Sequence, residues 1–299
     1  MTVLSMADGY GRMTGKPQAV IVHVDVGTQA LAHSMHNASV GRAPVFIFAG
    51  LCPFTETGEL PGPRTEYMHW LQEPHDQKAI VRQYCRHVGE VKTGLNVKQN
   101  VARAMQFAAS DPKGPTYLVA AREVLAEEIG KYELEPEQWT PLQPTQLPAP
   151  AAKRVADTLL NAKRPLVITG YSGRNRECPQ QLVRLAENIP GLRVFDSGGS
   201  DMCYPATHPA SQGFRLSFDE CTRDADAILI LDCDVPWIPG RNPPPKHAVI
   251  FEIGIDPLNR QIPVSFFPAN GRWKADSMLS LVQLDEYIET DATAASLLK

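Results

Sequence analysis

The stretch that decides the fold is Met1–Gln29, MTVLSMADGYGRMTGKPQAVIVHVDVGTQ. Residues 2–12 predict a helix, and residues 17–24 predict a buried strand. The next segment begins at Gly27-Thr28 and has apolar residues at helical spacing, and residues 43–50 are a second continuous apolar strand. Strands that are buried on both faces and separated by helices are typical of parallel sheets. This part of the chain therefore predicts an α/β domain.

The later part of the sequence repeats the same alternation. Residues 127–150 are acidic at first and then rich in proline, which indicates an extended linker. From residue 151 helix and strand patterns alternate again, and several predicted strands end near Asp or Gly, where parallel sheets bind ligands. We therefore predict a first domain over 1–126, a linker over 127–150, a second domain over 151–285 and a polar tail over 286–299.

The composition of the chain excludes several classes of function. The 299 residues are 43% hydrophobic, and their formal net charge is −4. A net negative charge gives no reason to expect that the chain binds nucleic acid or an anionic membrane. No apolar run approaches the roughly 20 residues of a membrane span. The six cysteines include no C-x-x-C pair, so reduced thiols are expected rather than zinc or disulfides. Neither a signal nor a transit peptide is visible, and we expect a cytoplasmic protein, although a missing N-terminus could hide such a segment.

Several motifs, in order, resemble one enzyme family. MADGYGRMTGKPQAVIV resembles A-x-G-Y-A-R-x-[ST]-G-K-P-x-V, a pattern of the pyrimidine-binding domain of thiamine diphosphate enzymes of the acetolactate synthase type. GRAPVFIFAG, HWLQEPHDQ and DPKGPTYLVAAREV are similar to later motifs of that domain, and LLNAKRPLVITGYSGRN, DADAILILDCDVPW and FEIGIDP resemble the central domain. The resemblance implies an α/β fold of two Rossmann-like domains with mainly parallel sheets.

The resemblance also implies cofactor-binding residues. The turn after the first strand lies near the pyrimidine in the family, which points to Asp25, Gly27 and Thr28, and the F-Q-E-x-D motif points to Gln72. This turn departs from the family's G-P-G, and Ala30 stands where the family has Asn. Gly27 could also be only a helix-start glycine, and Gln72 an ordinary exposed loop residue.

The resemblance implies thiamine diphosphate and Mg²⁺ as cofactors and a 2-keto acid as substrate. Aligned on these motifs, the family's activating Glu falls one residue before Met1, and Gly-Asp-Gly, the family's metal motif, occurs nowhere in the chain. We therefore assign no catalytic residue and no metal ligand, and we expect that the chain alone does not retain the cofactors. FAD is not expected, because DCDVPWIPGRN replaces the flavin-binding stretch of acetolactate synthases.

Three hypotheses follow from these observations. The first is a truncated relative of a thiamine diphosphate-dependent 2-keto acid decarboxylase or carboligase, inactive alone. The second is one subunit of a split enzyme whose diphosphate domain lies on a separate chain. The third is a non-catalytic interaction protein that retains the fold. We rank the first highest, and we expect a homo-oligomer, because a missing diphosphate domain would leave apolar surface exposed.

Overall fold

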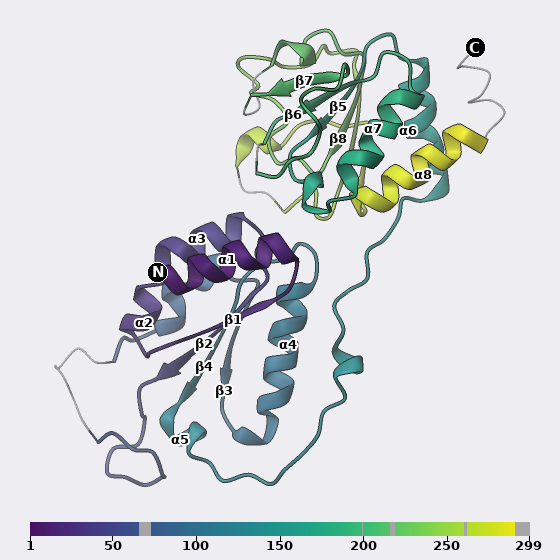
Figure 1. Ribbon diagram of the computed structural model, residues 1–299. Helices are drawn as coiled ribbons and strands as arrows, with labels where there is room; N and C mark the ends of the chain where they lie inside the picture. The colour runs from purple at the N-terminus through teal and green to yellow at the C-terminus, as the bar shows by residue number, and fades with distance from the viewer. Residues whose placement is uncertain (66–72, 199, 216–218, 260–261, 291–299) are drawn as a thin grey trace. The chain divides into compact units, whose positions relative to one another are not determined.

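A computed structural model describes residues 1–65, 73–198, 200–215, 219–259 and 262–290. The chain divides into two units, Met1–Gln143 and Pro144–Lys299 (Figure 1). Both units are α/β, and every strand pairing among the described residues is parallel. The predicted fold class is therefore confirmed.

Four strands form the sheet of the first unit, in the order β1-β2-β4-β3. They are β1 (Gln18–Val22), β2 (Val45–Leu51), β3 (His87–Val91) and β4 (Thr116–Ala121). In β2, Ile47 belongs to the core on one face and Phe46 to the core on the other, because successive side chains of a strand alternate between faces.

Helices cover both faces of this sheet, as Figure 1 shows. Helices α1 (Thr2–Thr14) and α3 (Ala32–Val40) pack on one face and α4 (Val97–Ala109) on the other. The short elements are α2 (Val26–Gln29), α5 (Arg122–Leu125) and 3₁₀ turns at Gln77–Ile80, Arg82–Tyr84, Gly94–Asn96 and Pro136–Trp139.

Strand β1 is less buried than its sequence predicts. Val20 is buried against α1 and α3, but the side chain of Ile21 is 76% exposed. β1 is an edge strand among the described residues, and α4 packs over β2, β3 and β4. The expectation that this strand is buried on both faces is therefore wrong.

The second unit contains a sheet of six strands in the order β10-β9-β8-β5-β6-β7. They are β5 (Pro165–Thr169), β6 (Arg193–Asp196), β7 (Ser211–Phe214), β8 (Ala227–Leu231), β9 (Val249–Gly254) and β10 (Gly271–Lys274). Helices α6 (Ala149–Asn161), α7 (Cys178–Asn188) and α8 (Ser277–Thr290) pack on one face. A second apolar cluster, which includes Trp237 and Phe267, covers the other face.

All six cysteines lie in the described part of the chain, and none forms a disulfide. Four of them are buried, and Cys52 and Cys85 are half-buried. Burial raises the pKa of the Cys85 and Cys178 thiols to about 12 and that of Cys203 to about 11. These thiols are therefore protonated at neutral pH.

Candidate functional site

A buried glutamine organises the loop ends of the first sheet. Gln77 is 3% exposed, and its Oε1 accepts a hydrogen bond from the backbone N–H of Asp25 at 2.9 Å. Its Nε2 donates to the carbonyl of Gly50 and to the hydroxyl of Tyr117, each at 2.9 Å. The side chain thus joins the turn after β1 to β2 and β4. Because Asp25 offers a donor and Gly50 an acceptor, only one orientation of the amide satisfies both.

The same network extends to the turn through a second buried contact. The Thr28 Oγ1 lies 2.6 Å from the Tyr117 hydroxyl, and both residues are fully buried. Burial raises the pKa of Tyr117, and the hydrogen bonds from Thr28 and Gln77 offset only part of that rise. The phenol therefore stays protonated and can donate to Thr28 while it accepts from Gln77.

The turn that this network holds is strained and closely packed. Asp25 has a φ of 49°, which is uncommon for a residue other than glycine, and its Oδ1 accepts a hydrogen bond from Gln29 Nε2 at 2.6 Å. At Gly27, an added Cβ would lie 3.1 Å from the Cβ of Val22, so a side chain there would force neighbouring atoms apart. Val26, between these residues, is 59% exposed. The turn is therefore a rigid backbone that presents one apolar side chain.

Three of the predicted site residues, Asp25, Gly27 and Thr28, lie together in this turn. The side chains of Asp25 and Thr28 are buried, so they support the turn rather than face solvent. Gln72 lies outside the described residues. Gln77 was not predicted, although it lies in the quoted segment HWLQEPHDQ, because nothing in the spacing distinguishes its glutamine from Gln72.

A polar cavity adjoins Gln77 beyond the ends of the strands. Its volume is about 460 Å³, and Leu51 of β2 and Ala121 of β4 are among its lining residues. The charged lining residues are Glu73, Asp76, Lys78, Arg82 and Glu90. The Lys78 ammonium pairs with Glu90, and Arg82 pairs with Asp76 at 2.7 Å. The cavity lies where parallel sheets bind ligands.

Glu123 holds the loop after β2 in place beside this cavity through hydrogen bonds. Its Oε1 accepts hydrogen bonds from the Phe54 N–H at 2.9 Å, the Thr55 N–H at 3.0 Å and the Thr55 hydroxyl at 2.7 Å. Burial alone would raise the pKa of Glu123, but these hydrogen bonds outweigh it and lower the pKa. Glu123 therefore remains a carboxylate and anchors the loop that follows β2.

In the second unit, backbone segments approach one another closely at the corresponding end of the sheet. A Cβ on Gly173 would lie 2.0 Å from the Met202 carbonyl oxygen, and one on Gly198 would lie 3.1 Å from the Cα of Gly170. Arg174 and Asp201 form an ion pair at 3.0 Å beside them. A side chain at either glycine would therefore force these loops apart.

The described residues contain neither a metal-binding cluster nor a membrane-spanning helix. There, no group of three His, Cys, Asp or Glu side chains is placed to hold a metal ion. In the same part of the chain, no helix has the length and apolar character to cross a membrane.

Comparison with known proteins identifies the family. Residues 2–80 match the family described as "Thiamine pyrophosphate enzyme, N-terminal TPP binding domain", and residues 152–266 match "Thiamine pyrophosphate enzyme, central domain". The acetolactate synthase large subunit of Haemophilus influenzae is 24% identical over 273 residues, 87% of this chain and 46% of that protein. The 2-hydroxyacyl-CoA lyase 2 of Mus musculus is 21% identical over 287 residues, 84% of this chain and 43% of that protein.

A solved structure shares the fold. Benzoylformate decarboxylase from Polynucleobacter necessarius superimposes with a TM-score of 0.77 at 20% identity, over 95% of this chain and 52% of that chain. The chain spans less than half the length of the two relatives above. The matches to two successive domains, with the motifs quoted from each, agree with this fold. The chain therefore belongs to the thiamine pyrophosphate enzyme family.

Proposed function

We propose that this chain supplies the pyrimidine-facing surface of a thiamine diphosphate site in an enzyme that decarboxylates or ligates 2-keto acids. The observation that carries the proposal is the Gln77 network, which fixes the turn at residues 25–29 against β2 and β4. A turn held by buried hydrogen bonds is preorganised, so it can orient a ring without ordering loop residues at the moment of binding.

The pyrimidine part of the cofactor suits this turn. The exposed Val26 side chain offers an apolar contact for a flat ring, and Gly27 keeps the backbone close to β1. When bound, thiamine diphosphate supplies an electron sink for cleavage of the bond next to a keto group. This chain would contribute ring orientation, through Val26 and Gly27, with Gln77 and Thr28 as supports.

The diphosphate and Mg²⁺ do not fit the residues present. Mg²⁺ prefers carboxylate and other oxygen ligands together with phosphate. Gly-Asp-Gly does not occur in the 299 residues, and the described residues offer no metal-binding trio of His, Cys, Asp or Glu. We assign no metal-dependent step to these residues, and we propose that the 299 residues alone are inactive and that a diphosphate-binding domain outside them completes the site. FAD is not proposed, because DCDVPWIPGRN stands where acetolactate synthases have their flavin-binding stretch.

The turn can be tested with the pyrimidine fragment of thiamine, 4-amino-5-hydroxymethyl-2-methylpyrimidine, by backbone-amide NMR. We expect weak binding with chemical-shift changes concentrated at residues 25–29. Val26→Glu should abolish them, because a charge replaces the apolar contact, whereas Val40→Glu, a change at another exposed valine, should leave them in place. Shift changes elsewhere only, or none, would overturn the proposed role of the turn.

The completeness of the site is tested by calorimetric titration of the 299-residue chain with thiamine diphosphate and Mg²⁺. We expect no measurable binding, because the sequence contains no Gly-Asp-Gly and the described residues offer no metal site to neutralise the diphosphate. A dissociation constant in the micromolar range would show that the 299 residues hold the whole cofactor, and the proposal that a diphosphate-binding domain outside them completes the site would then fail.

A further inference from the structure

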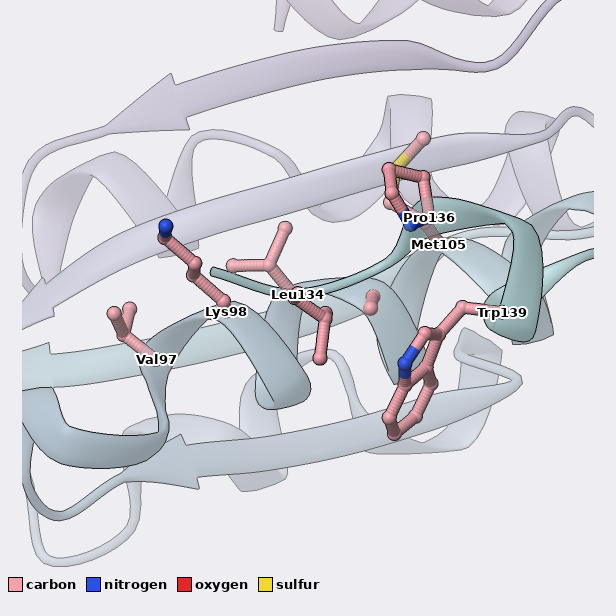
Figure 2. A pocket seen from close by; sticks show the side chains of 8 residues that line it. Val97, Lys98, Met105, Leu134, Pro136 and Trp139 are labelled. Carbon is pink, nitrogen blue, oxygen red and sulfur yellow. The ribbon is translucent and has the colours of Figure 1, made fainter. Parts of the chain in front are cut away.

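A second, apolar pocket lies on the outer side of α4, between that helix and the segment 127–143, which we name the strap. Its volume is about 460 Å³. Val97, Val101 and Met105 of α4 form one wall, and Leu134 and Trp139 of the strap form the other (Figure 2). The volume falls in the range of small-molecule sites, which are mostly apolar with few polar groups.

Hydrogen bonds hold the strap in place along its length. They join Glu127 Oε2 to the Gly94 N–H at 2.6 Å, the Tyr132 hydroxyl to the Lys98 N–H at 2.8 Å, the Thr140 carbonyl to Gln106 Nε2 at 2.8 Å, and the Leu142 N–H to Ser110 Oγ at 3.0 Å. Both ends and the middle of the strap are thus fixed to the helix or its flanks. These hydrogen bonds fix the position of the strap side chains relative to α4.

One cation marks an end of the pocket. Figure 2 shows Lys98 at one end and Trp139 at the other, with Leu134 between them. The Lys98 ammonium donates to the Tyr132 carbonyl and lies 4.9 Å from the centre of the Tyr132 ring. An ammonium has three N–H donors, so this contact leaves donors for a ligand. The exposed strap carboxylates Glu133, Glu135 and Glu137 do not line the pocket.

We infer that this pocket binds a small apolar carboxylate, with its ring or branched chain between α4 and the strap side chains Leu134 and Trp139 and its carboxylate at Lys98. The inference uses none of the residues of the proposed cofactor-facing turn, so it stands or falls independently of that function. Because the pocket uses both the strap and α4, an occupant would hold the strap more firmly on the first unit.

A matched ligand pair tests the inference: 1-naphthylacetate, a carboxylate, and 1-naphthylacetamide, its neutral analogue. Calorimetry with the full chain should show that the acid binds more tightly than the amide by about five-fold, the effect of roughly one kcal/mol from a solvent-exposed ion pair. Lys98→Met keeps the apolar stem and should remove this preference while amide binding persists. No binding of either compound to the wild-type chain, or an unchanged preference in Lys98→Met, would overturn the inference.

Separate variants test whether the ligand binds in this pocket. Ala102 lines the pocket, and Ala102→Trp should fill it and abolish binding of both compounds. Trp139→Ala should weaken the binding of both compounds by about ten-fold or more, because the contact with the indole ring is lost. Leu142→Ala is the control, because Leu142 is 73% exposed on the same strap but does not line the pocket. Circular dichroism melts should show that each variant folds, and undiminished binding by Trp139→Ala and Ala102→Trp would place the ligand elsewhere.

Discussion

At the scale of single residues, Gln77 connects parts of the chain that are distant in sequence. Its partners Asp25 and Tyr117 are 52 and 40 residues away. The turn itself could be predicted, because Gly27-Thr28 follows an apolar strand and opens a helical pattern. The network could not, because neither Gln77 nor Tyr117 differs in local pattern from an exposed polar residue or an ordinary strand aromatic. Their roles arise only when the sheet brings them together.

The first prediction concerns Gln77→Leu. This change leaves the Asp25 N–H and the Gly50 carbonyl without their buried partner, and an unsatisfied buried group costs about 1–3 kcal/mol. We expect the free energy of unfolding of the first unit to fall by about 2–4 kcal/mol in urea titrations. Gln143→Leu, at an exposed glutamine, is the control and should change the stability by less than about 0.5 kcal/mol. Equal effects of the two variants would contradict the structural role of Gln77.

The second prediction concerns Asp285 in α8. Burial raises its pKa from 3.8 to about 6, and Gln181 Nε2 donates to its Oδ2. The folded state therefore binds this proton more tightly than the unfolded chain, so the stability is fully present below about pH 4 and falls as the pH rises through about 6. Asp285→Asn should stabilise the second unit by about 1–3 kcal/mol at about pH 8 and by little at about pH 4. Urea titrations at both values check this, and a gain that does not depend on pH would contradict it.

At the scale of elements, α1 combines two different faces. Leu4, Ala7 and Gly11 are buried at a spacing of three and four residues, and Gly15 ends the helix with a φ of 69°. The opposite face bears the exposed apolar side chains Val3, Met6, Tyr10 and Met13, which we call the α1 stripe. Exposed apolar side chains gathered on one helix face favour association.

The third prediction is that the chain self-associates through the α1 stripe. Sedimentation at micromolar concentration should show dimers or larger species. The double variant Met6→Glu/Met13→Glu should shift the population towards monomer, because the introduced charges resist burial. Leu142→Glu, at an isolated exposed leucine, is the matched control and should leave the association unchanged. A wild-type chain that sediments as a monomer would disprove the prediction.

The strands show which elements a sequence can predict. Central strands such as β2, β4, β5 and β8 are continuous apolar runs, and their patterns predict them. Strands β3, β7 and β10 were not predicted, and each lies at the edge of its sheet. An edge strand needs fewer apolar side chains because its faces are less completely covered, and most residues of these three strands are only half-buried. Their sequences, HVGEV, SQGF and GRWK, therefore lack the pattern of a buried strand.

At the scale of the whole molecule, the two units have separate apolar cores. The core of the first is built on Leu31, Met35 and Ile47, and that of the second on Leu159, Leu182 and Leu281. Each unit has its own sheet and its own covering helices. Units with independent cores can in principle fold alone.

The fourth prediction follows from this division. Thermal or urea unfolding should resolve into two transitions, and each variant above should move only one of them. Gln77→Leu should lower the transition of the first unit, and Asp285→Asn should raise that of the second at about pH 8. Calorimetry of the two single variants and the double variant checks this. A single transition that both variants move would show that the units unfold together.

The rate at which a buried thiol is alkylated can report how often the fold around it opens. Only the thiolate reacts rapidly with alkylating agents, and a thiol whose pKa is about 12 has almost none at neutral pH. Alkylation of the buried Cys178 should therefore report each time the second unit exposes its interior. Mass spectrometry of chain labelled with iodoacetamide would time the opening of this unit, with no engineered probe.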